Sequence, residues 1–200
     1  TRTGLLDVLK RMGAHIEIFP NPIFRSSQRS ESGGVQAESL PAIHPPAHPY
    51  DEPSGDLLVR HSRLQAVNIS GPLVVRMIDE FPAFAIAAAF AEGESVISQA
   101  EELRFKESDR IGVLVRELRR LGMQAAERPD GFTITGGSLP TGGHVDAHGD
   151  HRLAMALALT GLAGQSPVTV TGAQIIAESF PEFPQVLCRL GADLQSEPEA

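Results

Sequence analysis

A spacing of apolar residues that is typical of an amphipathic helix recurs three times along the chain, and each time it ends at a glycine. Glycine suits the left-handed conformation in which many helices end. After the first of these glycines, polar and apolar residues alternate from His15 to Phe19, as they do in a half-buried strand. We therefore predict a recurring order of helix, glycine and strand. The helical segments are residues 6–14, 115–123 and 185–192, with the glycines Gly13, Gly122 and Gly191.

Two other segments are apolar on nearly every side of a helix, which predicts burial on every side. Asp79 precedes the first, at residues 81–89, and Asp150 precedes the second, at residues 153–159. Both helices are expected to end at a glycine and to lead into residues that favour strands. The glycines are Gly93 and Gly164, and the strand segments are 95–97 and 168–171.

These elements recur at a nearly constant distance. Asp79 and Asp150 are 71 residues apart, and Gly122 and Gly191 are 69 apart, so the chain contains a repeat of about 70 residues. Gly13 and Gly122, however, are 109 apart. We attribute the excess to an insertion at residues 21–55, which is rich in Pro, Ser, Gly and His and is expected to be a flexible surface loop.

The last helix is expected to start at Ser179. Ser179 and Glu182 have the spacing of a capping box, in which the two side chains bind free backbone N–H groups. Pro181 agrees with this interpretation, because proline is tolerated in the first turn of a helix.

Charge and composition narrow the classes of protein and partner. The net charge is −8 and the isoelectric point is near 5.3, which argues against nucleic acid or an anionic membrane as the main partner. The longest apolar run, residues 81–91, is shorter than the roughly 20 residues of a transmembrane helix, and the single Cys188 fits a reducing cytosol. We expect a soluble, cytoplasmic protein. Because it begins at Thr1, without Met, we also expect the chain to be the later part of a longer one.

Charged residues collect where predicted helices begin. Five of the seven residues from Arg104 to Arg110 carry charge, and Lys106 and Glu107 share a helical face with Arg110. Local ion pairs alone would explain one such cluster. Two further helix starts also carry charge, at Asp79 and at Asp150-His151-Arg152, so a shared site becomes the better interpretation.

The chemistry of these residues favours group transfer. Helix N-termini attract anions, and Arg110 and Arg152 can each bind a phosphate or carboxylate through two donors. The carboxylates of Asp79 and Glu107 would weaken a site that only bound an anion, so they indicate proton transfer. The sequence has neither a Gly-rich phosphate loop with Lys nor the order of a Ser-His-Asp triad.

A metal site is an alternative. The cluster His144-x-Asp146-x-His148-x-Asp150-His151 has close ligand spacing and partly resembles the His-x-His-x-Asp-His signature of metallo-β-lactamase-like hydrolases. Asp146 replaces the first bridging His of that signature, and the metal interpretation leaves the segment from Lys106 to Arg110 unexplained.

Four motifs, in this order, resemble the C-terminal half of the 5-enolpyruvylshikimate-3-phosphate synthase (3-phosphoshikimate 1-carboxyvinyltransferase) family. They are MIDEFP at 77–82, ELRFKESDR at 102–110, DHRLAM at 150–155 and SFPE at 179–182. The resemblance covers the chain apart from the insertion at 21–55. Enolpyruvyl transferases that act on UDP-N-acetylglucosamine are similar in fold but match these charged motifs less well.

The resemblance implies an α/β fold of the enolpyruvyl transferase type, in which each of two domains contains three βαβαββ units with helices inside and sheets outside. Residues 1–200 would be an incomplete fragment of the C-terminal domain with about two and a half repeats. The first strand and helix of that domain and the whole N-terminal domain of the same polypeptide would be missing.

The resemblance further implies transfer of the enolpyruvyl group of phosphoenolpyruvate to the 5-hydroxyl of shikimate 3-phosphate, with release of phosphate, on the route to chorismate and the aromatic amino acids. No metal or organic cofactor is implied. Asp79 matches the aspartate that takes the hydroxyl proton, and Glu107 the glutamate that protonates the methylene carbon. The implied binding residues are Asp79 and Lys106 for shikimate 3-phosphate, and Arg110, Arg152 and His151 for phosphoenolpyruvate.

One position departs from the family pattern, and one further alternative stays open. Some members have a Lys just before the Ser/Thr-Phe-Pro motif that contacts phosphoenolpyruvate, whereas this chain has Glu178. A carboxylate cannot make that contact, so Glu178 is left out of the site. The isolated fragment is expected to be inactive, because contacts from the other domain would be missing. A non-catalytic scaffold module built on the same repeats is therefore the third hypothesis.

Overall fold

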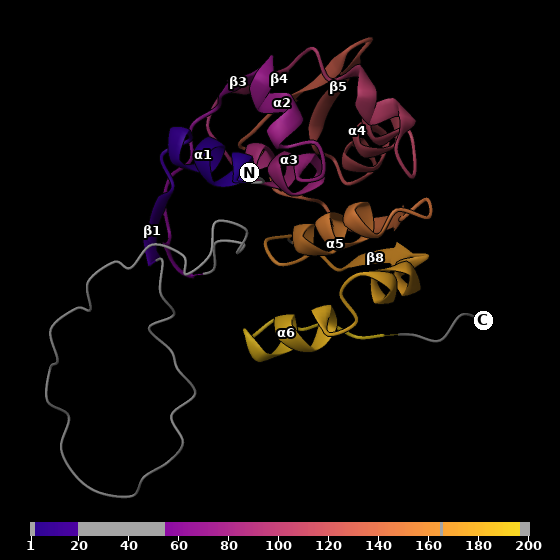
Figure 1. Cartoon of the computed structure of the whole chain (residues 1–200). Helices are drawn as coiled ribbons and strands as arrows, with labels where there is room; N and C mark the ends of the chain where they lie inside the picture. The colour runs from indigo at the N-terminus through magenta and orange to yellow at the C-terminus, as the bar shows by residue number, and fades with distance from the viewer. Residues whose placement is uncertain (1–2, 20–54, 165, 197–200) are drawn as a thin grey trace, which may run out of the picture. The chain divides into compact units, whose positions relative to one another are not determined.

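A computed structural model describes residues 3–19, 55–164 and 166–196 (Figure 1). The predicted insertion, residues 21–55, lies outside the described residues except for Gly55. The chain divides into two units, of which the smaller spans residues 14–62 and the larger contains residues 1–13 and 63–200.

The smaller unit contains one antiparallel pair of strands. β1 (His15–Phe19) pairs with β2 (Asp56–Arg60) so that Ile16 faces Val59. The strand predicted from the alternation after Gly13 is confirmed. In this pair Ile16 is buried, and the apolar side chains of β2 are largely exposed.

The larger unit contains one complete βαβαββ repeat. Its four strands lie in the order β3-β4-β6-β5, with β3 parallel to β4 and the other neighbours antiparallel. A short helix α2 (Pro72–Arg76) and a 3₁₀ helix η1 (Glu101–Phe105) complete this part of the chain. The repeat itself consists of β3 (Asn68–Ile69), α3 (Phe81–Ala89), β4 (Glu94–Ile97), α4 (Arg110–Arg120), β5 (Gln124–Arg128) and β6 (Gly131–Thr135).

The next repeat has the order βαβα. β7 (Gly143–Asp146) and β8 (Val168–Thr171) are parallel, and α5 (His151–Thr160) lies between them in sequence. A 3₁₀ helix η2 (Ala173–Glu178) and α6 (Phe183–Arg189) follow. The described residues after Gly191 form no strand, so the expected third copy of helix, glycine and strand is wrong in its last element.

The apolar helices lie in the core, as predicted. α3 packs against α5, and most of its residues belong to the main hydrophobic cluster, although Ala83 is exposed. No residue of α5 is exposed. β5 and β8 instead leave part of each strand exposed to solvent, which agrees with helices inside and sheets outside. Within the described ranges, no helix is long and apolar enough to cross a membrane.

Glycine ends the amphipathic helices as predicted. Gly13, Gly122 and Gly191 follow α1 (Gly4–Arg11), α4 and α6 with φ angles of 91°, 78° and 98°. After α4, the N–H of Gly122 donates to Arg119 O and that of Met123 to Leu118 O, each at 3.0 Å. These two bonds define the Schellman motif, which a residue with a Cβ would strain.

Three predicted helix ends differ from the structure. α3 and α5 end at Ala89 and Thr160, before Gly93 and Gly164. Ser179 does not start α6: it follows η2, and its N–H donates to Ile176 O at 3.1 Å. α6 begins at Phe183 because Pro184, which has no N–H to donate, fits only within the first turn.

Candidate functional site

The guanidinium group of Arg110 binds three carboxylates that come from three separate parts of the chain. Arg110 is the first residue of α4, and its side chain is 1% exposed. Nε donates to Asp150 Oδ2 at 2.7 Å, and Nη2 donates to Glu107 Oε2 at 2.5 Å. Nη1 donates to Asp79 Oδ1 at 3.4 Å. The acids that sequence analysis placed before three helices therefore meet at one cation.

Asp150 links this cation to the start of α5. Its Oδ1 accepts from the backbone N–H groups of Arg152 and Leu153 at 3.0 and 3.3 Å, while Oδ2 accepts from Arg110. Ser108 Oγ also donates to Oδ2, at 3.3 Å. Asp150 is fully buried, and each of its two oxygens accepts from donors of the protein.

Burial and ion pairing shift the pKa values of Asp150 and Arg110 in opposite directions. Burial raises the pKa of Asp150, but the hydrogen bond and charge of Arg110, together with the two backbone donors, outweigh burial and hold that pKa below its usual range. Burial likewise lowers the pKa of Arg110, and Asp150 and Glu107 raise it above its usual value. Both groups are therefore ionised at neutral pH.

Arg152 lies next to Asp79 and keeps one donor without a partner. Its Nη2 is 3.6 Å from Asp79 Oδ2, and Nη1 donates to the backbone oxygen of Asp79 at 3.4 Å. Its Nε is the single buried side-chain nitrogen or oxygen within residues 3–19, 55–164 and 166–196 that has no hydrogen-bond partner. Buried donors are nearly always bonded in folded proteins, so this N–H is suited to a ligand.

Lys106 and His151 are near the cluster in sequence, but no contact of the described structure joins them to Arg110. Lys106 Nζ lies 3.0 Å from Glu102 Oε1, and its side chain is largely covered. His151 is the first residue of α5 and is half-buried. The structure thus gathers four of the predicted site residues: Asp79, Glu107, Arg110 and Arg152.

Asp150 and Ser108 complete this arrangement, and the sequence-based site did not include either of them. The sequence marks Asp150 as a charge at a helix start, as a member of the DHRLAM motif and as part of the metal alternative, without a role in the site. The signal that points to it is an aspartate directly before a buried helix, a position in which its carboxylate caps the helix. The pairing of Asp150 with Arg110 joins residues 40 positions apart, and no local pattern reveals such a contact.

The metal alternative has no support from the geometry. His148 Nε2 contacts Glu117 Oε1 at 2.9 Å, the N–H of His148 donates to Asp146 Oδ1 at 2.6 Å, and Asp150 binds Arg110. Glu117 and Arg110 therefore bind His148 and Asp150, two of the five residues of the motif, in separate contacts. Within the part of the chain that the structure describes, no group of three or more His, Cys, Asp or Glu side chains is arranged to hold a metal ion.

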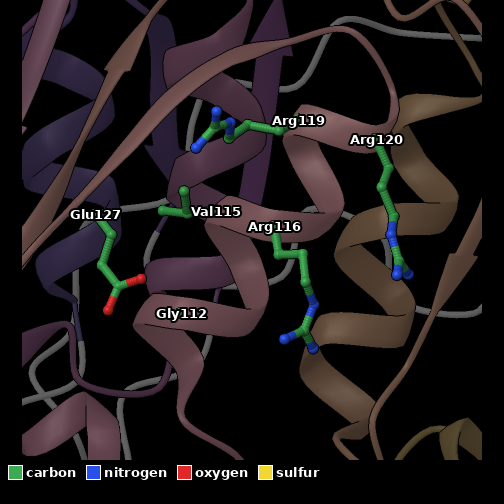
Figure 2. A pocket seen from close by; sticks show the side chains of 6 residues that line it. All are labelled: Gly112, Val115, Arg116, Arg119, Arg120 and Glu127. Atoms are coloured by element: carbon green, nitrogen blue, oxygen red, sulfur yellow. The ribbon is translucent and has the colours of Figure 1, made fainter.

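A separate cavity of about 340 Å³ lies on α4, away from the Arg110 cluster. Figure 2 shows that Arg119 points away from Arg116 and Arg120, so the three guanidinium groups do not converge on one ligand. None of the residues that gather around Arg110 lines this cavity. Its lining residues are Gly112, Val115, Arg116, Arg119, Arg120 and Glu127.

Comparison with known proteins assigns the chain to a family. The family model described as EPSP synthase (3-phosphoshikimate 1-carboxyvinyltransferase) matches residues 2–187. The chain belongs to the EPSP synthase family. A 3-phosphoshikimate 1-carboxyvinyltransferase from Synechococcus sp. (strain JA-3-3Ab) is 44% identical over 95% of this chain, but the match covers 37% of that protein. The chain therefore spans little more than a third of the length of this relative.

Solved structures agree with membership of the EPSP synthase family. EPSP synthase from Acinetobacter baumannii matches 98% of this chain and 40% of its own chain, with a TM-score of 0.77 and 31% identity. The enolpyruvyl transferase NikO from Streptomyces tendae matches 96% of this chain with a TM-score of 0.64 and 21% identity, which shows a common fold. The α/β fold class expected from the sequence is confirmed.

Proposed function

We propose that the natural polypeptide containing this chain transfers the enolpyruvyl group of phosphoenolpyruvate to the 5-hydroxyl of shikimate 3-phosphate and releases phosphate. The observation that carries this proposal is the meeting of Asp79, Glu107 and Arg152 around the buried Arg110. Membership of the EPSP synthase family supports it. The reaction needs a base, an acid and cations for an anionic substrate, and these residue types occur together here.

Each residue takes one role in the proposal. Asp79 accepts the proton of the 5-hydroxyl while the hydroxyl oxygen forms a bond to C2 of phosphoenolpyruvate. Glu107 donates a proton to the methylene carbon C3. The tetrahedral intermediate then loses phosphate from C2, which takes up the proton held by Asp79. Glu107 takes back a proton from C3, and the double bond between C2 and C3 forms again. Arg110, Arg152 and His151 bind phosphoenolpyruvate, and Lys106 binds shikimate 3-phosphate. No metal or organic cofactor takes part in this sequence of steps.

The local charge balance shows why this chain is expected to need more protein around it. Two guanidinium groups, of Arg110 and Arg152, face three carboxylates, of Asp79, Glu107 and Asp150. Lys106 brings the balance only to zero, and a site without net positive charge attracts an anion weakly. We infer that residues 1–200 are a fragment of the C-terminal domain, and that an N-terminal domain of the same polypeptide supplies further cations.

The exposed Glu178 remains outside the proposed site, since its carboxylate would repel phosphoenolpyruvate. We assign the natural polypeptide to the cytoplasm, and the free thiol of the single Cys188 supports this assignment because reducing compartments keep thiols free.

The test is turnover by the intact natural polypeptide supplied with shikimate 3-phosphate and phosphoenolpyruvate, with and without a chelator. We expect phosphate and enolpyruvylshikimate 3-phosphate in equal amounts under both conditions, and negligible turnover by residues 1–200 alone. Activity lost on chelation would favour the metal-dependent hydrolase. Absence of turnover, with binding of a protein partner retained after removal of Asp79 and Glu107, would favour the scaffold module.

A further inference from the structure

Glu117 is a buried carboxylate for which the proposed reaction has no use. It lies on α4 and is fully buried, although Arg116 and Arg120 on either side of it are about half exposed. Its Oε1 accepts from Arg116 Nε at 3.1 Å and its Oε2 from Arg120 Nη1 at 2.9 Å. Burial raises its pKa, but the hydrogen bonds from His148, Arg116 and Arg120 outweigh burial and lower the pKa below its usual range. A buried charge of this kind is costly unless it is fully paired.

Two of the contacts of Glu117 reach the loop that leads into α5. The backbone N–H of Asp146 donates to Oε2 at 3.3 Å, and His148 Nε2 lies 2.9 Å from Oε1. His148 Nε2 also lies 3.1 Å from Arg116 Nη2, so the ring is in contact with both the carboxylate and one of its guanidinium partners. Glu117 therefore fixes both the backbone and a side chain of this loop.

The loop is held in a conformation that has a cost. His148 has a φ of 51° and Gly149 has a φ of 69°, so two successive residues are left-handed. A non-glycine residue rarely adopts this conformation, and it does so where its surroundings hold it there. The N–H of His148 donates to Asp146 Oδ1 at 2.6 Å, while its ring is bound by Glu117. The next residue after this turn is Asp150, which caps α5.

α4 thus contacts this loop at two points on one of its faces. Arg110 and Glu117 are seven residues apart, which is two helical turns, and they bind Asp150 and His148 respectively. The first contact belongs to the cluster around Arg110. The second contact lies outside that cluster and constrains the direction in which α5 begins, and with it the place of Arg152.

We propose that Glu117 and His148 are positioning residues that hold the start of α5, with Asp150 and Arg152, against Arg110. The proposal rests on the proposed function, in which Arg152 binds phosphoenolpyruvate. It also gives His148 and Asp146 a role that requires no metal ion, because they hold the turn that sets the direction of α5.

The experiment compares Glu117→Gln and His148→Asn in the intact natural polypeptide. Asn tolerates the left-handed conformation, so His148→Asn removes the ring contact and retains the turn. The matched control is Arg119→Gln, because Arg119 is an exposed residue of the same helix whose side chain has no hydrogen bond or ion pair within the described residues. The readouts are the KM for phosphoenolpyruvate, kcat, the melting temperature and hydrogen exchange of residues 147–153.

We expect each of the two variants to raise the KM for phosphoenolpyruvate about tenfold, because a small displacement of a binding group is enough to weaken it. The value of kcat should change less than about threefold, since the proton-transferring groups stay in place. The double variant should be no worse than the more severe single variant, because both single variants already alter the contact between Glu117 and His148. Backbone exchange at residues 147–153 should become faster in both, and the control should match the wild type.

A purely structural role predicts a different result, namely a lower melting temperature and a smaller active fraction with an unchanged KM. An unchanged KM in folded variants, or effects that add in the double variant, would overturn the proposal. If the wild type makes no product, the proposed function fails, and hydrogen exchange then decides the positioning role by itself. Unaltered exchange at residues 147–153 in both variants would refute that role, and faster exchange in both would support it.

Discussion

The guanidinium of Arg110 and the carboxylate of Asp150 form an ion pair of 2.7 Å in which the two side chains are 1% and 0% exposed. The same carboxylate caps α5 and the same guanidinium begins α4, so one contact joins the ends of two helices. The structure offers a comparison, because Asp7 and Arg76 pair at 2.6 Å with side chains that are more than 40% exposed. The two pairs differ in burial, and Asp150 in addition caps α5.

Removing one member of the buried pair should cost far more stability than removing one member of the exposed pair. Asp150→Ala leaves a buried Arg110 without its main partner and α5 without a cap, so we expect a loss of about 3–5 kcal/mol in the free energy of unfolding. Asp7→Ala should cost less than about 1 kcal/mol. Urea denaturation of both variants of the intact polypeptide measures the difference. Equal losses would show that burial of the Arg110 pair is not what gives it its strength.

The lowered pKa values of Asp150 and Glu117 predict acid sensitivity. A carboxylate whose pKa is lower in the folded state stabilises the fold at every pH above its unfolded value, near 4, and loses this contribution as the pH falls through the folded value. The melting temperature should therefore be steady from pH 7 to about pH 5 and fall steeply below pH 4. Asp150→Asn should begin from a lower melting temperature and show a shallower fall. An identical acid transition in wild type and variant would contradict the prediction.

The proton-transfer roles of Asp79 and Glu107 predict a loss of rate with little loss of structure. Asp79→Asn and Glu107→Gln keep the shape of each side chain and remove its ability to exchange a proton, so kcat should fall by about 10²–10⁴. Glu102→Gln is the control, because Glu102 pairs with Lys106 in the same segment and is 68% exposed. Steady-state kinetics measures the loss of rate, and melting temperatures measure any loss of structure. A kcat near that of the wild type in Glu107→Gln would remove Glu107 from the proposed reaction.

Two glycines of the larger unit allow a test of the fold that does not depend on activity. A Cβ on Gly131 would lie 2.1 Å from Ile97 O, an impossible contact at the end of the β4–β6 pair, where β6 begins. Gly131→Ala should destabilise the fold by roughly 1–3 kcal/mol. At Gly161 the nearest atom would be 3.4 Å away and φ is −65°, so Gly161→Ala should be neutral or stabilise by up to about 1 kcal/mol. Thermal melts of both variants measure the two effects. If Gly161→Ala lowered the melting temperature more than Gly131→Ala, the placing of Gly131 against β4 would be wrong.

The local patterns of the sequence were sufficient wherever a few neighbouring residues decide the structure. The ends of α1, α4 and α6 depend on hydrogen bonds between residues at most five positions apart and on one glycine, so Gly13, Gly122 and Gly191 could be predicted. The burial of α3 and α5 followed from side chains that are apolar all round. The prediction that the last helix begins at Ser179 was wrong because two local signals competed. The spacing of Ser179 and Glu182 indicated a start at Ser179, but the ring of Pro184 decides that α6 begins at Phe183.

The tertiary structure decided which charges meet. The motifs predicted four site residues: Asp79, Glu107, Arg110 and Arg152. Two contacts could not be predicted in this way, because they exist only where α4 packs against the loop before α5. Arg110 contacts Asp150, 40 residues away, and Glu117 contacts His148, 31 residues away. Burial then changes the value of these contacts: in a low-dielectric interior a carboxylate must find a cation or a donor, whereas at the surface water would serve. Helices and their ends follow from interactions along the chain, and the choice of partner for each buried charge follows from packing.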